Sequence, residues 1–302
     1  MAEPAAAPMD ISALGALLRD TVWQWFNANA QRLGASLAFY SVFSMAPLLV
    51  VVVGIAGLVF GREAAEGQIV WQIRDLIGQQ GAEVIQTMLK NANRPAAGVL
   101  ATAIGLLVLL FGASAVFAEL RSSLNMVWGV QAPATVGLVS ILKNRFFSFA
   151  MVMAIGFLLL VSLVVNAILS AAGTLMGGML PVPEPVLQLV NTAISLAAIT
   201  GLFALLYKVV PDVTIAWQDV MTGAFVTALL FSAGKLAIGL YLGKASIGSA
   251  YGAAGSVVVL LMWVYYSAQV FFLGAVFTRL YAERYGSRAP RLKGRAGRPR
   301  AA

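Results

Sequence analysis

Residues 34–60 read GASLAFYSVFSMAPLLVVVVGIAGLVF, which is 27 residues without a charged side chain. A helix of that length rises about 40 Å, more than the roughly 30 Å hydrocarbon core of a bilayer, even when the helix is tilted. The stretch also contains serines, a tyrosine and a proline. We therefore predict a membrane-spanning helix with one face that serves something other than lipid.

The rest of the chain has the same character, since 60% of its 302 residues are hydrophobic, 11% are charged and its mean hydropathy is +0.87. This composition predicts an all-α, polytopic membrane protein with six transmembrane helices. No cleavable signal peptide is expected, because no basic region with a short apolar core precedes the first span. The six predicted spans cover residues 34–60, 96–117, 147–171, 186–207, 217–241 and 254–278.

Basic residues indicate the orientation of these spans. The side that holds both termini carries 14 of the 20 Lys and Arg residues, and the other side carries five. The positive-inside rule therefore predicts cytoplasmic termini, although without the tail the split is only six against five. The predicted organisation is a cytoplasmic N-terminal region at 1–33, a transmembrane domain at 34–278 and a basic cytoplasmic tail at 279–302.

Three segments outside the spans carry their own predictions. The external loop, residues 61–95, predicts two short helices broken near Gly81. The tail after Tyr285 is rich in Gly, Pro and Arg and is expected to be disordered and attracted to anionic lipid, with nucleic-acid contact as the less favoured alternative. Ahead of the first span, an amphipathic helix on the inner membrane surface is predicted by the spacing of Ile11, Leu14, Leu17, Leu18, Val22, Trp25 and Phe26.

Cysteine and histidine are both absent from the chain. This excludes disulfides, thiol chemistry, imidazole bases and metal sites built from His or Cys. We expect no catalytic residue, no metal and no cofactor.

Polar residues inside the spans are the candidates for function, because each needs protein or water as a partner. Ser36, Tyr40 and Ser44 are spaced by four and share one face of the first span, and Pro47 favours a kink near its middle. The alternative is that these serines allow close packing and bond to their own backbone.

The other candidates fall into two predicted levels. Asn125, Asp219 and Gln269 are assigned to the inner half, where they are expected to meet the Tyr40 face, whereas Lys235 is assigned to a separate outer level, about 24 Å from Asp219 along a regular helix. Interfacial salt bridges and snorkelling side chains are the alternatives. The secondary candidates are Glu119, Arg121, Asp212 and Arg279 on the inner side, and Asn166 and Asn191 on the outer side.

Four stretches together resemble the YihY/BrkB family of bacterial inner-membrane proteins, once labelled ribonuclease BN. They are ASLAFYSVFSMAPLL in the first span, SSLNMVWGV after the second, LYKVVPDVTIAWQDVMTGAFVTALLFSAGKLAIGLYL through the fifth and YGAAGSVVVLLMWVYYSAQVFFLGAVFTRLYAER across the sixth. The resemblance covers about residues 20–285. It implies a six-helix fold with both termini inside and a bacterial inner-membrane location.

One position departs from this resemblance. The family commonly has Gly-Ala-Glu where this chain has Gly274, Ala275 and Val276. A carboxylate near the inner end of the sixth span is missing, and so is the proton-coupling role it suggests. The old ribonuclease label finds no support, because the chain has no histidine and no clustered carboxylates for metal ions.

These observations favour a transporter or flippase-like protein for a lipid or another amphipathic, anionic substrate. The competing hypothesis is a non-catalytic membrane scaffold or assembly factor for envelope biogenesis. The expected partners are membrane lipids, with anionic headgroups at the basic tail. A homo-oligomer stays open and nucleic acid is not expected.

Overall fold

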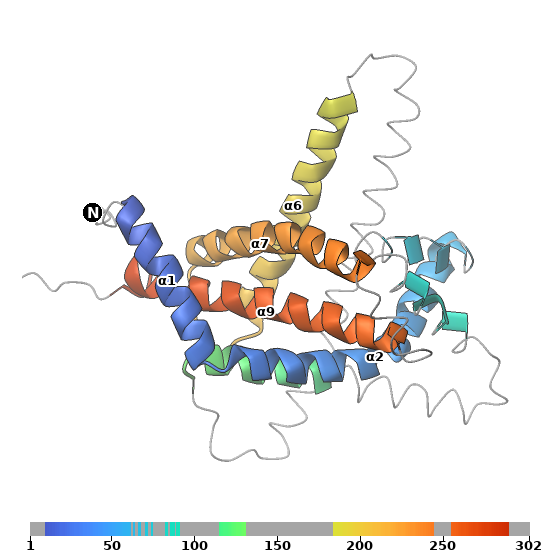
Figure 1. Cartoon of the computed structure of the whole chain (residues 1–302), viewed down its shortest axis with the longest axis horizontal. Coiled ribbons are helices and arrows are strands. Elements are labelled where there is room, and N and C mark those ends of the chain that lie inside the picture. Colours follow the sequence, from blue (N-terminus) through green and yellow to red (C-terminus); the bar gives the residue numbers. More distant parts are fainter. Residues whose placement is uncertain are drawn as a thin grey trace, which may run out of the picture.

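The computed structural model describes residues 10–61, scattered positions between 63 and 90, and residues 115–130, 184–244 and 255–289. Every regular element within these ranges is a helix, which agrees with the predicted all-α class. Besides an unlabelled helix at 115–127, the elements are α1 (Ile11–Asn27), α2 (Ala30–Phe60), α6 (Glu184–Val209), α7 (Trp217–Lys244) and α9 (Gly255–Arg284), shown in Figure 1.

Three stretches within the described helices are long and apolar enough to span a membrane, namely Thr192–Val209, Trp217–Ile238 and Val257–Arg284. They coincide with the predicted fourth, fifth and sixth spans, and α2 coincides with the first. The predicted spans at 96–117 and 147–171 lie almost wholly outside the described residues, as does most of the loop at 61–95. The count of six therefore stays a prediction.

The turn between α1 and α2 is made by Asn29, which has a φ of 52°. Asparagine enters this left-handed region more readily than most residues. The Asn29 carbonyl accepts bonds from the amides of Arg32 at 2.9 Å and Leu33 at 3.2 Å and so begins α2. From there α2 is assigned as one helix across Pro47, for which a kink was predicted.

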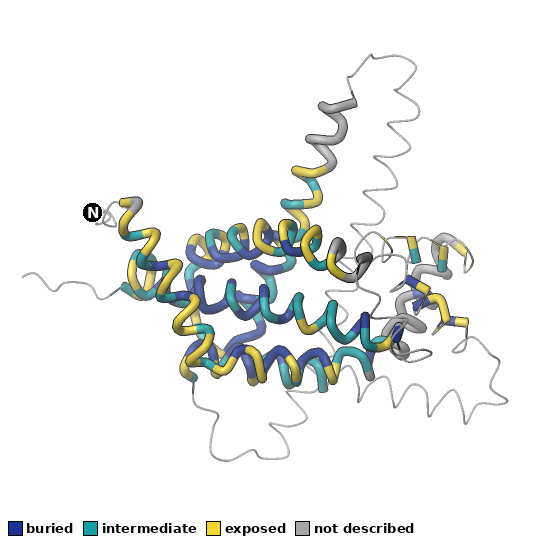
Figure 2. Tube along the Cα trace, in the orientation of Figure 1, coloured by how far each residue is buried: buried dark blue, intermediate teal, exposed yellow. Residues whose placement is uncertain are grey.

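Helix α9 is the centre of the described bundle. It lies between α7 and α2, while α6 packs against α7 and α1 crosses the end of α9 (Figure 1). Of its span-length stretch 39% is buried, against 28% for α7 and 22% for α6, and Figure 2 shows the buried positions gathered along these facing sides. Helix α9 therefore holds its neighbours in place.

Helices α7 and α9 interlock through two matching pentapeptides, GAFVT at 223–227 and GAVFT at 274–278. A Cβ on Gly223 would lie 2.7 Å from Thr278 Cβ, and a Cβ on Gly274 would lie 2.8 Å from Thr227 Cβ. Each threonine hydroxyl donates to the carbonyl of the glycine four residues earlier, at 2.7 Å in both cases. Each glycine thus makes room for the threonine of the opposite helix, in the close packing typical of membrane helices.

Helix α6 joins this contact through Tyr207, which is fully buried. Its hydroxyl donates to the Phe271 carbonyl at 2.7 Å and lies 3.1 Å from Thr227 Oγ1. Its ring stacks on Phe203 and tilts against Phe271, with centroids 6.2 and 5.1 Å apart. One side chain therefore bonds to both α7 and α9.

Helix α1 is present as predicted, but its apolar residues divide between two surroundings. Leu17 is buried and Trp25 packs against the core, whereas Leu18 and Phe26 are exposed. The apolar positions that predicted an amphipathic helix therefore do not all share one surrounding, because α1 packs on α9 and part of its apolar surface meets protein. The location of α1 on the membrane surface stays a prediction.

Candidate functional site

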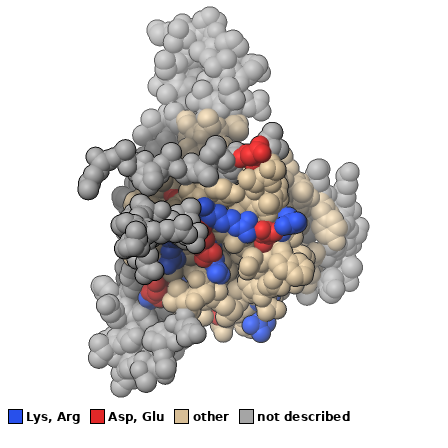
Figure 3. Space-filling view, turned by 90° about the vertical axis from the view of Figure 1, so that its left-hand side faces the viewer, with Lys and Arg blue, Asp and Glu red and all other residues tan. Residues whose placement is uncertain are grey.

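The candidate residues gather in two places along the bundle. The first is the end at which α1, residues 115–130, the α6–α7 loop and the end of α9 meet, here called the polar end. Figure 3 shows this side of the molecule, where charges of both signs interrupt the uncharged surface. The second place is the middle of the apolar spans, about half-way along α9.

At the polar end, Asp212 of the α6–α7 loop binds two residues of helix 115–127. Arg121 donates through Nε to Asp212 Oδ2 at 3.0 Å and also binds Oδ1. Asn125 donates through Nδ2 to Asp212 Oδ2 at 2.7 Å and accepts the Asp212 amide at 2.8 Å. The salt bridge that was the alternative interpretation for Asp212 is thus observed. Both ends of the Asn125 amide are occupied by Asp212, so Asn125 fixes the loop.

Asp219, in the first turn of α7, is 4% exposed. Its Oδ2 accepts bonds from the Ser287 amide at 2.9 Å and the Ser287 hydroxyl at 2.6 Å. Gly286 is required beside it, because a Cβ there would lie 2.5 Å from the Asp219 carboxyl carbon. Arg288 then lies over the Trp128 ring, 5.7 Å from its centroid. Asp219 therefore anchors the chain that follows α9.

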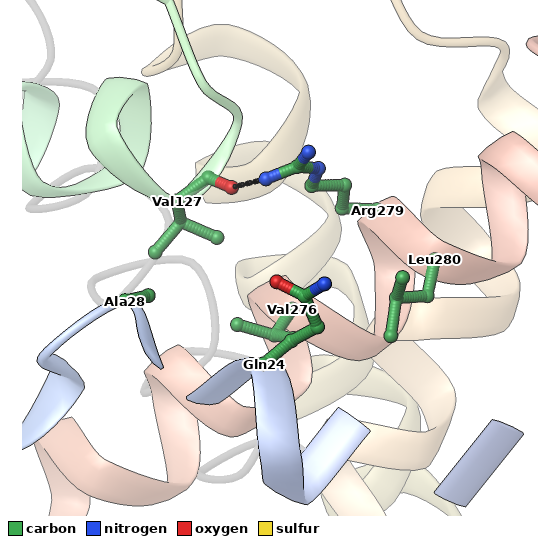
Figure 4. A pocket seen from close by; sticks show the side chains of 6 residues that line it. All are labelled: Gln24, Ala28, Val127, Val276, Arg279 and Leu280. Atoms are coloured by element: carbon green, nitrogen blue, oxygen red, sulfur yellow. Dashed lines mark hydrogen bonds between the residues drawn. The ribbon is translucent and has the colours of Figure 1, made fainter. Parts of the chain in front are cut away.

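Arg279 ties α9 to helix 115–127 beside a small pocket. Its Nε donates to Glu283 Oε1 at 2.9 Å, and a terminal nitrogen donates to the Val127 carbonyl at 2.7 Å (Figure 4). The pocket has a volume of about 10 Å³, which is room for about one water molecule. It is lined by Gln24, Ala28, Val127, Val276, Arg279 and Leu280.

In the middle of the bundle, Gln269 packs against the start of α2. Its Nε2 reaches the Gln31 carbonyl at 3.5 Å, and a Cβ on Gly34 would lie 3.1 Å from its carboxamide carbon. Its Oε1 is buried and has no hydrogen-bond partner among the described residues. A buried acceptor without a partner is uncommon, because its desolvation is not compensated.

Lys235 lies at nearly the same depth as Gln269. Gly234, the residue before it, packs against Tyr266, because a Cβ there would lie 3.0 Å from the Tyr266 ring. Tyr266 and Gln269 are three residues apart in α9, which is about 4.5 Å along its axis. Lys235 is half-buried at this level, about 24 Å from Asp219 in the same helix.

This arrangement corrects the two predicted levels. Tyr40 lies six residues, about 9 Å, beyond Gly34 in α2, so it too is close in depth to Lys235. Asn125 and Asp219 are instead engaged at the polar end. Gln269 contacts α2 at Gln31 and Gly34, and no contact with the predicted face of Ser36, Tyr40 and Ser44 is seen among the described residues. The predicted meeting of that face with Asn125 and Asp219 is wrong. The prediction was wrong because the depth of each polar residue was measured from assumed span boundaries.

The remaining candidates are placed as follows. Ser44 is buried and donates to the Ser41 carbonyl at 3.0 Å, which is the backbone-bonding alternative, while Ser36 is half-buried and Tyr40 is 38% exposed. Glu119 is half-buried in helix 115–127. Asn166 lies outside the described residues, as do the side chains of Pro47 and Asn191.

Comparison with known proteins decides the family. A family model described as Virulence factor BrkB matches residues 22–298. The chain belongs to the BrkB family. The resemblance seen in the four sequence stretches is thereby confirmed.

Curated relatives of this BrkB protein carry the name UPF0761 membrane protein. The one from Saccharophagus degradans is 28% identical over 91% of this chain and 61% of its own length. Those from Tolumonas auensis and Stenotrophomonas maltophilia are 28% and 30% identical, over 87% and 80% of this chain and 85% and 55% of their own lengths. This chain spans 58–61% of the length of the Saccharophagus degradans protein and of further relatives from Pseudomonas and Verminephrobacter eiseniae. No solved structure matches it.

Val276, the position at which this BrkB protein departs from the resemblance, lines the pocket next to Arg279 and is 3% exposed. Arg279 lies one turn further along α9 and pairs with Glu283. The charge of Arg279 is thus compensated in this chain by Glu283, four residues after it, rather than by a carboxylate at position 276.

The sequence reading missed the residues that bind the helices of this BrkB protein most closely. Tyr207, Thr227 and Thr278 were not candidates, although all three stand in the recognised stretches. The signal that would have found the threonines is the pair of glycine-to-threonine spacings of four, at 223–227 and 274–278.

The loop contact at Asp212 gives a pH prediction. The hydrogen bond from Arg121 holds the pKa of the Asp212 carboxyl below its ordinary value, with Asn125 helping and partial burial opposing. A lowered folded-state pKa means that the contact stabilises the fold above the ordinary value of about 4 and is lost as the pH falls through the folded-state pKa. Thermal unfolding in detergent should therefore show wild type more stable than Asp212→Asn at neutral pH.

This difference should disappear in acid below the ordinary aspartate range. Thr214→Ala, an exposed change in the same loop, serves as the control and should follow wild type throughout. A stability difference that stays constant down to strongly acidic pH would refute the contribution of the Asp212 charge.

Proposed function

We propose that this BrkB-family protein is a bacterial inner-membrane protein, with both termini in the cytoplasm, that moves a lipid or another amphipathic, anionic molecule across or along the membrane. The proposal includes no enzymatic reaction and no cofactor. In this proposal Lys235 and Gln269 belong to the substrate pathway, and the residues of the polar end hold the helices together.

The observation that carries this proposal is the matched depth of Lys235 and Gln269. Both lie inside long apolar helices, one with an ammonium group and the other with a buried amide oxygen that has no hydrogen-bond partner in the part of the chain that the structure describes. A charged side chain at the centre of a membrane helix costs about 2.5–3.5 kcal/mol on insertion scales. Lys235 lies nearer the end of the stretch Trp217–Ile238 and costs less, but function is still the default explanation for an ionisable residue inside a span.

The contacts at the polar end support the separation of pathway residues from residues that hold the helices together. Asp212 is bonded to Arg121 and Asn125, Asp219 is bonded to Ser287, and Arg279 is bonded to Glu283. These groups are used in holding helices and loops together. Lys235, which follows Gly234 at the contact with Tyr266, carries an ammonium group suited to an anionic headgroup, since an ammonium forms strong charge-assisted bonds with phosphate or carboxylate.

The test is reconstitution of the full chain in sealed liposomes with fluorescent phosphatidylglycerol, phosphatidylethanolamine and phosphatidylcholine, and with anionic solutes. Wild type should transfer at least one anionic substrate faster than protein-free liposomes. Lys235→Ala should lower that rate about tenfold or more, because a hydrogen bond to a charged group contributes about 1.5–3 kcal/mol.

Lys208→Ala is the matched control for this experiment. Lys208 lies in the last turn of α6, donates to the Ile215 carbonyl and lies 5.6 Å from the Trp217 ring centroid, so it belongs to the polar end. Its loss should leave the transfer rate near that of wild type. Equal rates for wild type and protein-free liposomes with every substrate would end the transport proposal.

A non-catalytic scaffold for envelope assembly is the second proposal. The exposed apolar residues of α1 favour it, because they offer a surface to a partner. A scaffold predicts that cells keep the function when Lys235 is replaced by alanine and lose it when a terminal segment is removed. Membrane lipids are the partners in both proposals, and a homo-oligomer is compatible with either.

A further inference from the structure

Helix α1 presents two different faces. One face is fixed to the bundle, since Leu17 and Thr21 are buried, and Asp20 accepts a bond from Arg284 of α9 at 2.7 Å. The other face is here called the outer stripe, and it is apolar and exposed. It consists of Leu14, Leu18, Val22 and Phe26, which are 39%, 48%, 46% and 52% exposed.

The outer stripe is continuous, because its four residues are spaced by four and therefore lie above one another on the helix. Over 17 residues α1 is about 25 Å long, so the stripe runs along most of its length. Arg19 lies beside the stripe, where its side chain is 79% exposed and pairs with Asp20 at 3.2 Å, and Trp23 is 67% exposed. An apolar strip bordered by a cation and a tryptophan is the composition of helices that lie in a membrane interface.

The position of α1 identifies what covers this stripe. The helix ends at Asn27, and α2 begins at Ala30, so the last turn of α1 lies at the level at which the first span begins. Its contact with α9 holds it across the end of that span (Figure 1). A lipid leaflet is therefore the apolar surface that we expect beside α1.

We propose that the outer stripe of α1 inserts into the membrane leaflet at which α2 begins, with Arg19 placed at anionic headgroups. Because α1 is held against α9, its insertion into the leaflet would set the depth of the whole bundle in the membrane. This proposal does not depend on transport.

The absence of cysteine from all 302 residues makes the test direct. Single variants Leu14→Cys, Leu18→Cys and Val22→Cys, with Arg19→Cys and Leu17→Cys for comparison, carry a nitroxide spin label in the full chain. Each is placed in bilayers of phosphatidylethanolamine and phosphatidylglycerol. The measurement is the accessibility of the label to molecular oxygen, which concentrates in lipid, and to a water-soluble nickel complex.

We expect the three stripe positions to be accessible to oxygen and protected from nickel, and Arg19→Cys to show the reverse. Leu17→Cys, if folded, should be protected from both reagents. The stripe positions are exposed, so each reports independently if another variant fails to fold. In bilayers of phosphatidylcholine alone, the stripe labels should lie closer to water, because the attraction of Arg19 to anionic headgroups is absent.

Three results would overturn the proposal. High nickel accessibility at all stripe positions would place the stripe in water. Protection from both reagents would mean that another protein covers the stripe, and spin–spin broadening would identify that protein as a second copy of this chain. An unchanged depth in phosphatidylcholine would refute the role of anionic headgroups.

Discussion

Gly223→Ala and Gly274→Ala each lower the free energy of unfolding of the helical bundle by about 1–3 kcal/mol, the usual cost of overpacking a close contact. The added methyl groups would meet Thr278 and Thr227 at distances that real Cβ atoms do not show, and at Gly274 the Tyr207 hydroxyl lies 2.6 Å away as well. Helices α7 and α9 must then move apart, and Tyr207 loses its place between them. Thermal or denaturant unfolding in detergent micelles measures the loss.

Gly201→Ala is the control for both glycine variants. Gly201 lies in α6 with nothing within 4 Å of its Cβ position, so alanine should be neutral or stabilising there, by up to about 1 kcal/mol of helix propensity. The double variant Gly223→Ala with Thr278→Gly removes the overlapping side chain and should regain part of the loss. If Gly223→Ala is as stable as Gly201→Ala, the interlock of α7 and α9 does not hold the bundle.

Tyr207→Ala should destabilise the bundle by about 3 kcal/mol, the lower end of the range for emptying a large buried site. The lower end applies because the separated helices meet lipid rather than water, which removes much of the transfer free energy. Tyr207→Phe keeps the ring and loses only the bonds to Phe271 and Thr227, so it should cost about 1 kcal/mol.

Tyr241→Ala is the matched control for the tyrosine series. Tyr241 lies near the end of α7 and is 53% exposed, so its removal should change the free energy of unfolding by less than about 0.5 kcal/mol. The expected order of stability is wild type, Tyr241→Ala, Tyr207→Phe and Tyr207→Ala. A Tyr207→Ala variant as stable as Tyr241→Ala would contradict the role given to Tyr207.

The helices of this protein were predictable wherever a long apolar run leaves a membrane span as the one suitable structure. A run such as residues 217–241 is too long and too apolar for anything but a span, and α7 was found there. The amphipathic spacing before the first span likewise predicted α1. Its two faces were not separable from the sequence, because Leu17 and Leu18 are equally apolar and only the contact with α9 distinguishes them.

The candidate site was predictable only in part. Arg121, Asn125 and Asp212 were recognised as polar for their depth, and they do meet. The relative depth of Tyr40 and Lys235 was not available from the sequence, since it is set by how Gly34 and Gly234 pack on α9. The packing register between helices is a tertiary property. Small residues set it by allowing close contacts at particular positions, and a hydropathy profile does not predict those positions.

The most direct test of the central claim is the initial rate at which sealed proteoliposomes transfer the anionic substrate, measured for wild type, Lys235→Arg and Lys235→Gln at equal protein density. The account predicts that Lys235→Arg keeps most of the rate and that Lys235→Gln, which removes the charge, falls toward the protein-free rate. Equal transfer by Lys235→Gln and wild type would contradict the claim that a cation in the middle of the bundle receives the substrate.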